Sequence, residues 1–472
     1  MSWITKDFEK LKRLTMNQKL NCLGPATRRE FMRIGALALG GMTLPDVLAS
    51  RAAAGNSSAE TSVIMFWMWG GPSQLETYDL KPNAPSDYRG PFRPISTNVA
   101  GLDICEHMPL QAKIADKFSI IRSLHHEMSA HNDGSIEVLT GKTPSVPDLT
   151  SQARSEHPDF GMIASRVRGA RTDGLPQYVG AHKAPFMTQP QYLGLSSKAF
   201  ETGDPSVKDF SPPNLKLIAE TDNNRLIERR SLVSQLDRYR RDLDLNGSLD
   251  GIDQFRGAAF DILSSASVAS AFDLKQEPES VRERYGSHRW GQSCLLARRL
   301  AESGVAVINI DATATNDKSP HFSWDDHSSA FDLGVANQER LPQMDQAISA
   351  LIQELYERGL DRRVLVLACG EFGRTPRLTH SPKNFLGQPS VGRDHWPQAF
   401  SALISGGGLR MGQVVGATNS RAEYPTQSPV SPQDLLATVY RHLGIDSTRN
   451  FINFAGRPIP ILPYGEPIKE LI

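Results

Sequence analysis

The fold is decided by the stretch Val63-Ile64-Met65-Phe66-Trp67-Met68-Trp69, which is followed at once by Gly70-Gly71-Pro72. A continuous apolar run of this length, ended by a turn signal, is typical of a strand that is buried on both faces of a sheet. Such strands belong to parallel sheets that helices cover on each side. The sequence therefore predicts an α/β fold with residues 63–69 as a central strand.

The remaining chain alternates between strand and helix patterns. Strands are predicted at 118–121, 305–310, 364–368 and 400–404, and helices at 290–302, at 338–357 and around Leu435-Leu436. Residues 142–215 are rich in Pro, Ser and Gly, so loops with short elements are expected there. Apolar spacing over 224–243 predicts a half-exposed helix in an insertion at about 200–290. The fold class expected is a doubly wound, mostly parallel sheet, in which ligands bind beyond the carboxyl ends of the strands.

Composition narrows the function classes. The 472 residues include 52 basic and 52 acidic side chains, and 39% of all residues are hydrophobic. These values exclude a disordered chain, a collagen-like fibre and a multi-span membrane protein. Zero net charge argues against a nucleic-acid partner, which would require a basic excess. The four cysteines are too few for a disulfide scaffold, and buried free thiols are expected instead at Cys105, Cys294 and Cys369.

The first 54 residues carry the pattern of an export signal. Thr27-Arg28-Arg29-Glu30-Phe31-Met32-Arg33 is a twin-arginine motif, and the apolar run 34–44 that follows is too short to span a membrane core of ~30 Å. Ala52-Ala53-Ala54 then offers a signal-peptidase site. We expect residues 1–54 to be a Tat signal peptide read by the Tat translocase. The mature chain, 55–472, is expected to be periplasmic or secreted, without a transmembrane anchor.

A first polar cluster, Trp324-Asp325-Asp326-His327, follows the strand predicted at 305–310. A carboxylate and an imidazole two residues apart can face one point from a loop, as a divalent metal site requires. A polar loop with Asp-turn residues is the simpler explanation of the tetrapeptide taken alone, and both interpretations stay open.

A second cluster, Gly370-Glu371-Phe372-Gly373-Arg374-Thr375-Pro376, follows the strand predicted at 364–368, and Gly392-Arg393-Asp394-His395-Trp396-Pro397 comes later. Glu371 is a candidate metal ligand or general base. The planar donors of Arg374 and Arg393 suit a phosphate or sulfate oxyanion. Ordinary salt bridges in a surface loop are the alternative.

A third cluster consists of His125-His126 and, five residues later, His131-Asn132-Asp133-Gly134. It precedes a helix that ends near Leu139-Thr140-Gly141. Three histidines in seven residues indicate a binding or catalytic role, with helix capping and solvent exposure as the alternative.

Together with Trp69-Gly70-Gly71-Pro72-Ser73, these motifs resemble one bacterial family, catalogued as domain of unknown function 1501, over nearly all of the mature chain. Members of that family are typically Tat-exported and resemble the sulfatase and alkaline phosphatase superfamily. The resemblance implies that superfamily's fold for residues 55–472, with active-site loops at the strand ends and divalent metal ions bound there. It does not supply a reaction.

Carried over residue by residue, the resemblance implies that Asp325 (or Asp326), His327 and His395 are metal ligands, with Glu371 as a ligand or a catalytic carboxylate. The superfamily's carboxylates after the first strand are replaced here by Gly70-Gly71. His131 stands where sulfatases carry a modified cysteine or serine, and histidine cannot be converted to formylglycine. A histidine there can be a metal ligand, a general base or a phosphate acceptor.

Two functions remain open. The first is an exported, metal-dependent hydrolase of phosphate or sulfate esters on small anionic molecules or polysaccharides, with zinc, calcium or manganese as the metal. Its catalytic residues would be His131, Arg374 and Glu371, and its substrate-binding residues Arg374, Arg393 and His126. The second is a non-catalytic relative that binds a sulfated or phosphorylated glycan.

Overall fold

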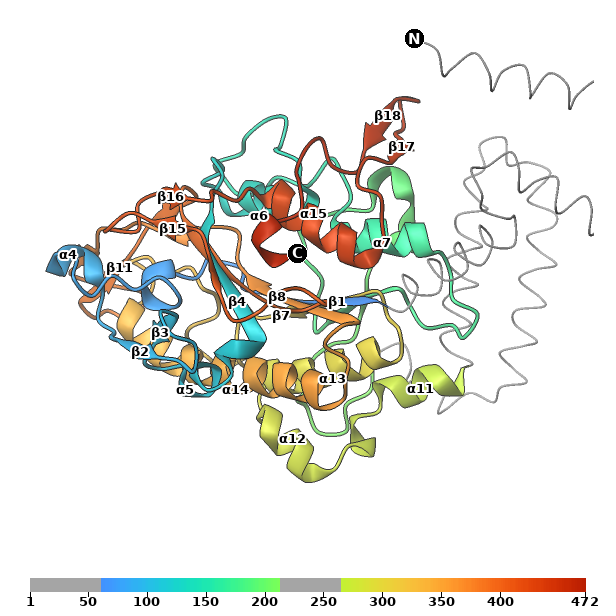
Figure 1. Cartoon of the computed structure of the whole chain (residues 1–472), viewed down its shortest axis with the longest axis horizontal. Helices are drawn as coiled ribbons and strands as arrows, with labels where there is room; N and C mark the ends of the chain where they lie inside the picture. Colours follow the sequence, from blue (N-terminus) through green and yellow to red (C-terminus); the bar gives the residue numbers. More distant parts are fainter. Residues whose placement is uncertain (1–60, 213–264) are drawn as a thin grey trace, which may run out of the picture. The chain divides into compact units, whose positions relative to one another are not determined.

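The computed structural model describes residues 61–212 and 265–472. These residues belong to one compact unit, 58–472. The predicted signal peptide and the helix predicted at 224–243 lie outside the described residues. A central sheet runs through the unit, with helices on both of its faces (Figure 1).

Within the described residues, eight strands form the central sheet. In spatial order they are β14 (Val414–Val415), β4 (Phe118–Leu124), β13 (Phe400–Gly406), β8 (Val364–Cys369), β1 (Ser62–Trp67), β7 (Val307–Asp311), β5 (Tyr178–Ala181) and β6 (Phe200–Glu201). Only β13 is antiparallel to its neighbours, β4 and β8, and the other pairings are parallel. The doubly wound, mostly parallel α/β class predicted from the sequence is confirmed.

Strand β1 is central because its side chains are buried on both faces. Ile64 and Phe66 pack into the apolar core on one side of the sheet, and Val63, Met65 and Trp67 pack into the core on the other. This alternation is the period-two geometry of a strand. An uninterrupted apolar run was therefore the right signal for this strand.

Helices cover each face of the sheet (Figure 1). α13 (Arg289–Glu302) and α14 (Leu333–Glu357) lie below it in the view of Figure 1, with α5 (Pro109–Ala112), α11 (Ala266–Phe272) and α12 (Glu279–Tyr285) on the same side. α6 (His131–Thr140), α7 (Phe160–Arg168) and α15 (Pro432–Leu443) lie above it. None of the described helices combines the length and the apolar character that a membrane span requires.

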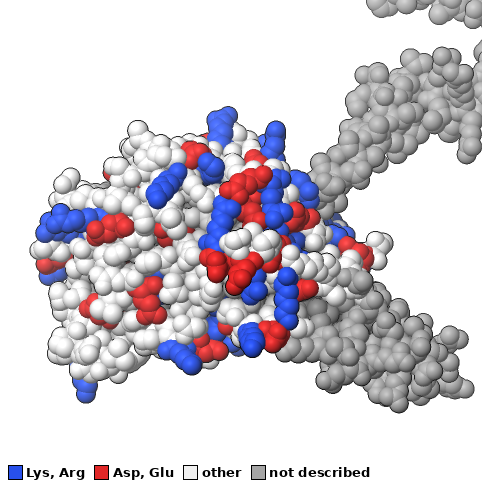
Figure 2. Space-filling model, turned by 90° about the horizontal axis from the view of Figure 1, so that it is seen from below, with Lys and Arg blue, Asp and Glu red and all other residues white. Residues whose placement is uncertain are grey.

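Charges of both signs are mixed on the face that carries α12 and α14, as the view from below shows (Figure 2). Arg284 of α12 makes a 2.7 Å ion pair with Glu357 at the end of α14. Beneath this surface, Arg298 of α13 is buried between Glu277 and Glu354. Ion pairs therefore help to join the three helices beneath the sheet.

The predicted elements are present with small shifts in their bounds. All five predicted strands lie in the sheet, and α14 starts five residues earlier than predicted because Asp332 caps it, accepting a hydrogen bond from the Val335 amide. The Pro-rich stretch contains α7 and β5, which the sequence pattern did not reveal. Cys105, Cys294 and Cys369 are free and buried, as expected.

Five neighbouring strands bring their loops to one edge of the sheet. Chain segments leave that edge after β4, β8, β1 and β7, whose carboxyl ends meet there. Because β13 is antiparallel, its beginning, not its end, lies at this edge. The loop before β13 therefore joins the loops after the other four strands, at the place where α/β sheets bind ligands.

Candidate metal centre

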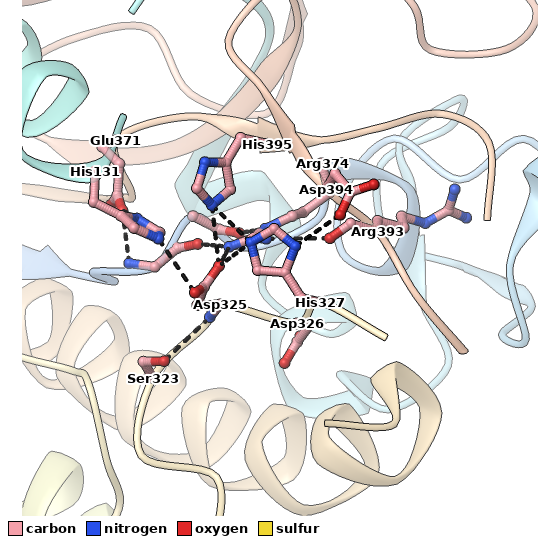
Figure 3. Close-up of polar contacts among 12 residues, drawn as sticks. His131, Ser323, Asp325, Asp326, His327, Glu371, Arg374, Arg393, Asp394 and His395 are labelled. Carbon is pink, nitrogen blue, oxygen red and sulfur yellow. Dashed lines mark hydrogen bonds and ion pairs between the residues drawn. The ribbon is translucent and has the colours of Figure 1, made fainter. Parts of the chain in front are cut away.

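Four side chains meet at this edge of the sheet. They are His131, Asp325, His327 and His395, and each offers one donor atom within 4.8 Å of the others. Figure 3 shows the three imidazoles directed at the Asp325 carboxylate. The side chains of Asp325 and His327 are each 26% exposed and that of His395 is 22% exposed, so the cluster can be reached from solvent.

The four residues of the cluster come from three chain segments, two that follow strands of the central sheet and one that precedes a strand. His131 is the first residue of α6, which follows β4. Asp325 and His327 lie in the long loop between β7 and α14. His395 lies in β12 (His395–Trp396), which pairs antiparallel with β9 (Gly373–Arg374), directly opposite Arg374.

The Nδ1 atom of each imidazole faces an acceptor outside the cluster. Nδ1 of His131 is 2.7 Å from Oε1 of Glu371. For His327 the partner is Oδ1 of Asp394 at 2.7 Å, and for His395 it is the Ser129 carbonyl oxygen at 2.7 Å. A carbonyl oxygen only accepts hydrogen bonds, and a carboxylate does the same when it is ionised, so each Nδ1 carries a proton and each Nε2 points to the centre, where it can bind a metal ion once it has no proton.

These Nε2 atoms surround one carboxylate. Nε2 of His131 is 3.2 Å from Oδ2 of Asp325. Nε2 of His327 and Nε2 of His395 are 3.1 and 3.2 Å from Oδ1 of the same residue. The three Nε2 atoms and the two Asp325 oxygens face one another, so they need a cation among them, which is either a proton on a nitrogen or a metal ion. This arrangement, with imidazoles oriented by acceptors behind them, is the one that metal sites use.

The pKa values follow from these contacts. Burial raises the pKa of Asp325, but hydrogen bonds from the three histidines and the charge of Arg374 hold it well below its usual value. Burial lowers the pKa of His131, yet hydrogen bonds to Asp325 and Glu371 outweigh it and raise that pKa to about 9. The pKa of His395 is lowered, chiefly by burial. Asp325 is therefore ionised, and a metal bound here would displace a proton from His131.

Gly70, after β1, brings the backbone close to both Asp325 and Glu371. The Gly70 amide donates a 2.8 Å hydrogen bond to Oε1 of Glu371, the same oxygen that faces His131. Gly70 has a φ of +110°, and a Cβ there would lie 2.5 Å from the Asp325 amide nitrogen. At the position where the sequence has Gly70-Gly71 in place of the carboxylates that the resemblance implies, the Gly70 amide contacts Glu371.

Arg374 lies directly behind Asp325. Its Nη2 atom donates to Oδ1 of Asp325 at 2.6 Å and also to the Gly70 carbonyl. Its Nε atom donates to the Gly71 carbonyl at 2.9 Å, and Nη1 donates to the Arg393 carbonyl at 3.2 Å. The side chain is fully buried. Arg374 is thus brought to the cluster, where its contacts fix a ligand carboxylate; the oxyanion contact expected for it stays a prediction.

Arg393 and His126 lie one layer further from the centre. The guanidinium of Arg393 is buried and forms an ion pair at 2.8 Å with Glu76, which is also buried. His126 accepts a hydrogen bond from the Met128 amide at Nδ1 and faces the Glu371 carbonyl through Nε2 at 2.6 Å. These contacts position the loops around the cluster. The substrate-binding role expected for both residues stays a prediction.

The structure decides between the two adjacent aspartates. Asp325 faces the histidines, whereas Asp326 is buried and accepts from Nη2 of Arg340 and from Asn337 at 3.1 Å. Glu371 is not one of the four donors, because its carboxylate stands behind His131. Sequence reasoning did not single out Asp394, although it lies in the same motif as His395; its position next to a predicted ligand was the available signal.

The fold and the site together define a mostly parallel α/β protein with a candidate metal centre of three histidines and one aspartate at the carboxyl edge of its sheet. The chain belongs to the family described as Protein of unknown function (DUF1501), whose model matches residues 60–472. The family indicated by the sequence motifs is thereby confirmed. No curated protein sequence matches the chain.

Several solved structures are similar to the chain at low sequence identity. A lipoteichoic acid synthase from Listeria monocytogenes is 10% identical with a TM-score of 0.37, and the match covers 88% of this chain and 77% of that one. A sulfatase from Pseudoalteromonas sp. is 12% identical with a TM-score of 0.35, covering 89% and 72%. A phosphonate monoester hydrolase from Silicibacter pomeroyi is 12% identical with a TM-score of 0.35, covering 82% and 74%.

Proposed function

We propose that this protein is an exported, metal-dependent hydrolase of phosphate or sulfate esters, with small anionic molecules or polysaccharides as substrates. Export rests on the twin-arginine motif, the short apolar run and the Ala-Ala-Ala site in residues 1–54. It makes the Tat translocase a partner during export and the periplasm or the medium the place of action. Fusing residues 1–54 to a folded reporter tests this, because export must then depend on the twin arginines.

The observation that carries the hydrolase proposal is the convergence of three imidazole Nε2 atoms on the Asp325 carboxylate. A divalent ion held by these four side chains would act as a Lewis acid on an ester oxygen or on water. The cluster is partly exposed, so an ester can approach it from solvent.

The donor set favours zinc over calcium. Zinc is commonly held by histidine nitrogens together with a carboxylate, and it can expand to five-coordinate, so water or an ester oxygen could bind beside four protein donors. Calcium takes about 6–8 oxygen ligands, and here three of the four converging side chains offer nitrogen. Manganese, which prefers oxygen ligands, is likewise a poorer match than zinc.

The chain's own residues keep the donors in place. Glu371 and Asp394 hold the rings of His131 and His327 by their Nδ1 atoms. Arg374 fixes the carboxylate of Asp325 and keeps it ionised. The donors are therefore oriented before any ligand arrives, which lowers the cost of binding a metal and an anionic ester.

The second function, a non-catalytic protein that binds a sulfated or phosphorylated glycan, is favoured by one observation. His131 occupies the position implied for the nucleophile, yet both of its ring nitrogens are engaged, one with Asp325 and one with Glu371. A histidine used as a ligand is not free to attack an ester. Hydrolysis would then depend on water as the nucleophile.

Metal analysis combined with ester hydrolysis separates the two functions. The chain is purified without added metal or chelator, its elemental content is measured, and it is assayed with 4-nitrophenyl phosphate and 4-nitrophenyl sulfate. We expect bound zinc and turnover of at least one ester, both lost in Asp325→Asn, with Asp317→Asn as the control because the Asp317 side chain is 87% exposed. A metal-loaded chain that hydrolyses neither ester supports the glycan-binding function.

A further inference from the structure

Two aromatic side chains extend from the metal-ligand cluster toward the surface. The centroid of the Trp69 ring lies 5.0 Å from that of His131 and 5.8 Å from that of Phe186. Trp69 follows β1 and is half-buried, whereas Phe186, in the loop after β5, is 50% exposed. We call these two residues the aromatic wall. It leads from a ligand of the cluster to solvent.

The exposed ring of Phe186 is held in place. Arg154 donates a hydrogen bond to the Phe186 carbonyl, and its guanidinium carbon lies 5.3 Å from the centre of the Phe186 ring. Met187, the next residue, is fully buried and anchors the loop from below. An aromatic ring that an anchored loop holds at the surface is available to contact a ligand.

Arg154 also brings a positive charge to the aromatic wall. It is exposed, and no carboxylate in the described parts of the chain, 61–212 and 265–472, forms an ion pair with it. A guanidinium stacked on an aromatic face keeps N–H groups free at its rim, and these suit a sulfate or phosphate oxygen. Arg154 thus adds, at the exposed end of the aromatic wall, a positive charge that no described carboxylate pairs.

We propose that Trp69, Phe186 and Arg154 form a subsite for the sugar ring of an anionic, sulfated or phosphorylated glycan, and this proposal names the substrate class of the hydrolase proposed above. The C–H face of a sugar ring packs against Phe186 while its hydroxyls remain in water, because an aromatic ring offers a flat apolar surface. Arg154 donates to a sulfate or phosphate group on the ring or on its neighbour.

Three polymers test the subsite in the purified full chain by affinity electrophoresis. Dextran sulfate carries sugar rings and charge, dextran carries the rings alone, and polyvinyl sulfate carries the charge alone. The wild type should bind dextran sulfate more tightly than either of the others. Phe186→Ala should weaken dextran sulfate binding by roughly tenfold and leave polyvinyl sulfate binding unchanged, since only the ring contact is lost. Phe186→Tyr should retain binding.

Two further variants complete the set. Arg154→Met should weaken the binding of both sulfated polymers, because it removes the charge that they share. Phe454→Ala is the matched control: Phe454 is 82% exposed between β17 (Asn450–Ile452) and β18 (Pro458–Pro460), and its loss should change nothing. Equal binding of dextran sulfate and polyvinyl sulfate by the wild type, or an unchanged affinity in Phe186→Ala, would overturn the subsite.

These experiments measure polymer binding and not ester hydrolysis, so the subsite proposal and the hydrolase proposal can fail separately. A chain that binds dextran sulfate through Phe186 but hydrolyses no 4-nitrophenyl ester keeps the subsite and loses the hydrolase. A chain that hydrolyses those esters but binds the three polymers alike keeps the hydrolase and loses the subsite.

Discussion

Nε2 of His327 lies 2.9 Å from Nε2 of His395. Both rings have their Nδ1 atoms against acceptors, Asp394 for the first and the Ser129 carbonyl for the second. Two lone pairs at this separation repel each other unless a cation lies between or beside them. The His327–His395 pair therefore requires either a bound proton or a bound metal ion.

Removal of either histidine should abolish metal binding. His327→Ala and His395→Ala each delete one of four donors and leave a site that is open to water, so metal content should fall to background. Elemental analysis of the purified variants checks this. His380→Ala is the control, because His380 is exposed and outside the cluster; full metal content in both cluster variants would rule out the site.

Glu371→Gln should weaken metal binding without removing a donor. Glu371 fixes His131 through Nδ1, and loss of such an outer carboxylate typically lowers metal affinity by about 10–100-fold. Zinc titration with a competing chelator measures the change. The matched control is Glu339→Gln, which breaks a second histidine–glutamate contact, 2.6 Å from His321, that lies outside the cluster. Equal affinities in the two variants would contradict the role of Glu371.

Gly70→Ala should lower the unfolding free energy far more than the same substitution at Gly101, another glycine with positive φ. Gly70 and Gly101 both have positive φ, +110° and +80°, but only at Gly70 would a Cβ meet backbone, 2.5 Å from the Asp325 amide. Gly101→Ala should cost about 1–2 kcal/mol in unfolding free energy for the conformation alone. Gly70→Ala should exceed about 4 kcal/mol and lose metal as well. Urea unfolding of both variants tests the difference.

Removing one partner of the buried Glu76–Arg393 pair should strongly destabilise the protein. Glu76→Gln leaves the fully buried guanidinium of Arg393 without its counter-charge, and such losses cost about 3–5 kcal/mol. Glu466→Gln is the control, since its pair with Lys469 is exposed and should contribute less than about 1 kcal/mol. Urea unfolding of the two variants should separate them; similar losses would show that Arg393 finds other partners.

Asp345 should make stability depend on pH. It accepts hydrogen bonds from the Leu110 and Gln111 amides, and burial raises its pKa to about 6. An unfolded aspartate titrates at about 3.9, so below that value the protonated group contributes its full stability, and the contribution is lost as the pH rises through about 6. The unfolding free energy of the wild type minus that of Asp345→Asn should fall by up to about 3 kcal/mol between pH 4 and pH 7. A difference that stays constant or rises contradicts the shift.

Most of the fold could be predicted because strands buried on both faces leave long apolar runs in the sequence, as at Val364–Cys369. β5 was missed for a physical reason. Its four residues include Gly180, which weakens a strand pattern, yet a Cβ there would lie 2.7 Å from the Ala184 amide, so the close approach of the following loop requires glycine. At Gly180, packing therefore requires the residue type that makes a strand hardest to recognise in the sequence.

The candidate site could be predicted only in part. Spacing pointed to Asp325 or Asp326 together with His327, and the family resemblance added His395 as a ligand and His131 as a catalytic residue, but neither could decide which of the adjacent Asp325 and Asp326 faces the centre. That choice depends on Arg340 beneath the loop, which binds Asp326. Other partners are joined only by the tertiary fold: Glu76 and Arg393 are 317 residues apart in the sequence.

The place of β13 in the sheet bears on how the protein is synthesised. β13 lies between β4 and β8, and it is the last of the three to leave the ribosome. Until it does, β4 cannot join the strands around β1, and His131 stays apart from Asp325. His395 itself is made only a few residues before β13. A nascent chain therefore has no complete set of donors before this strand has been made.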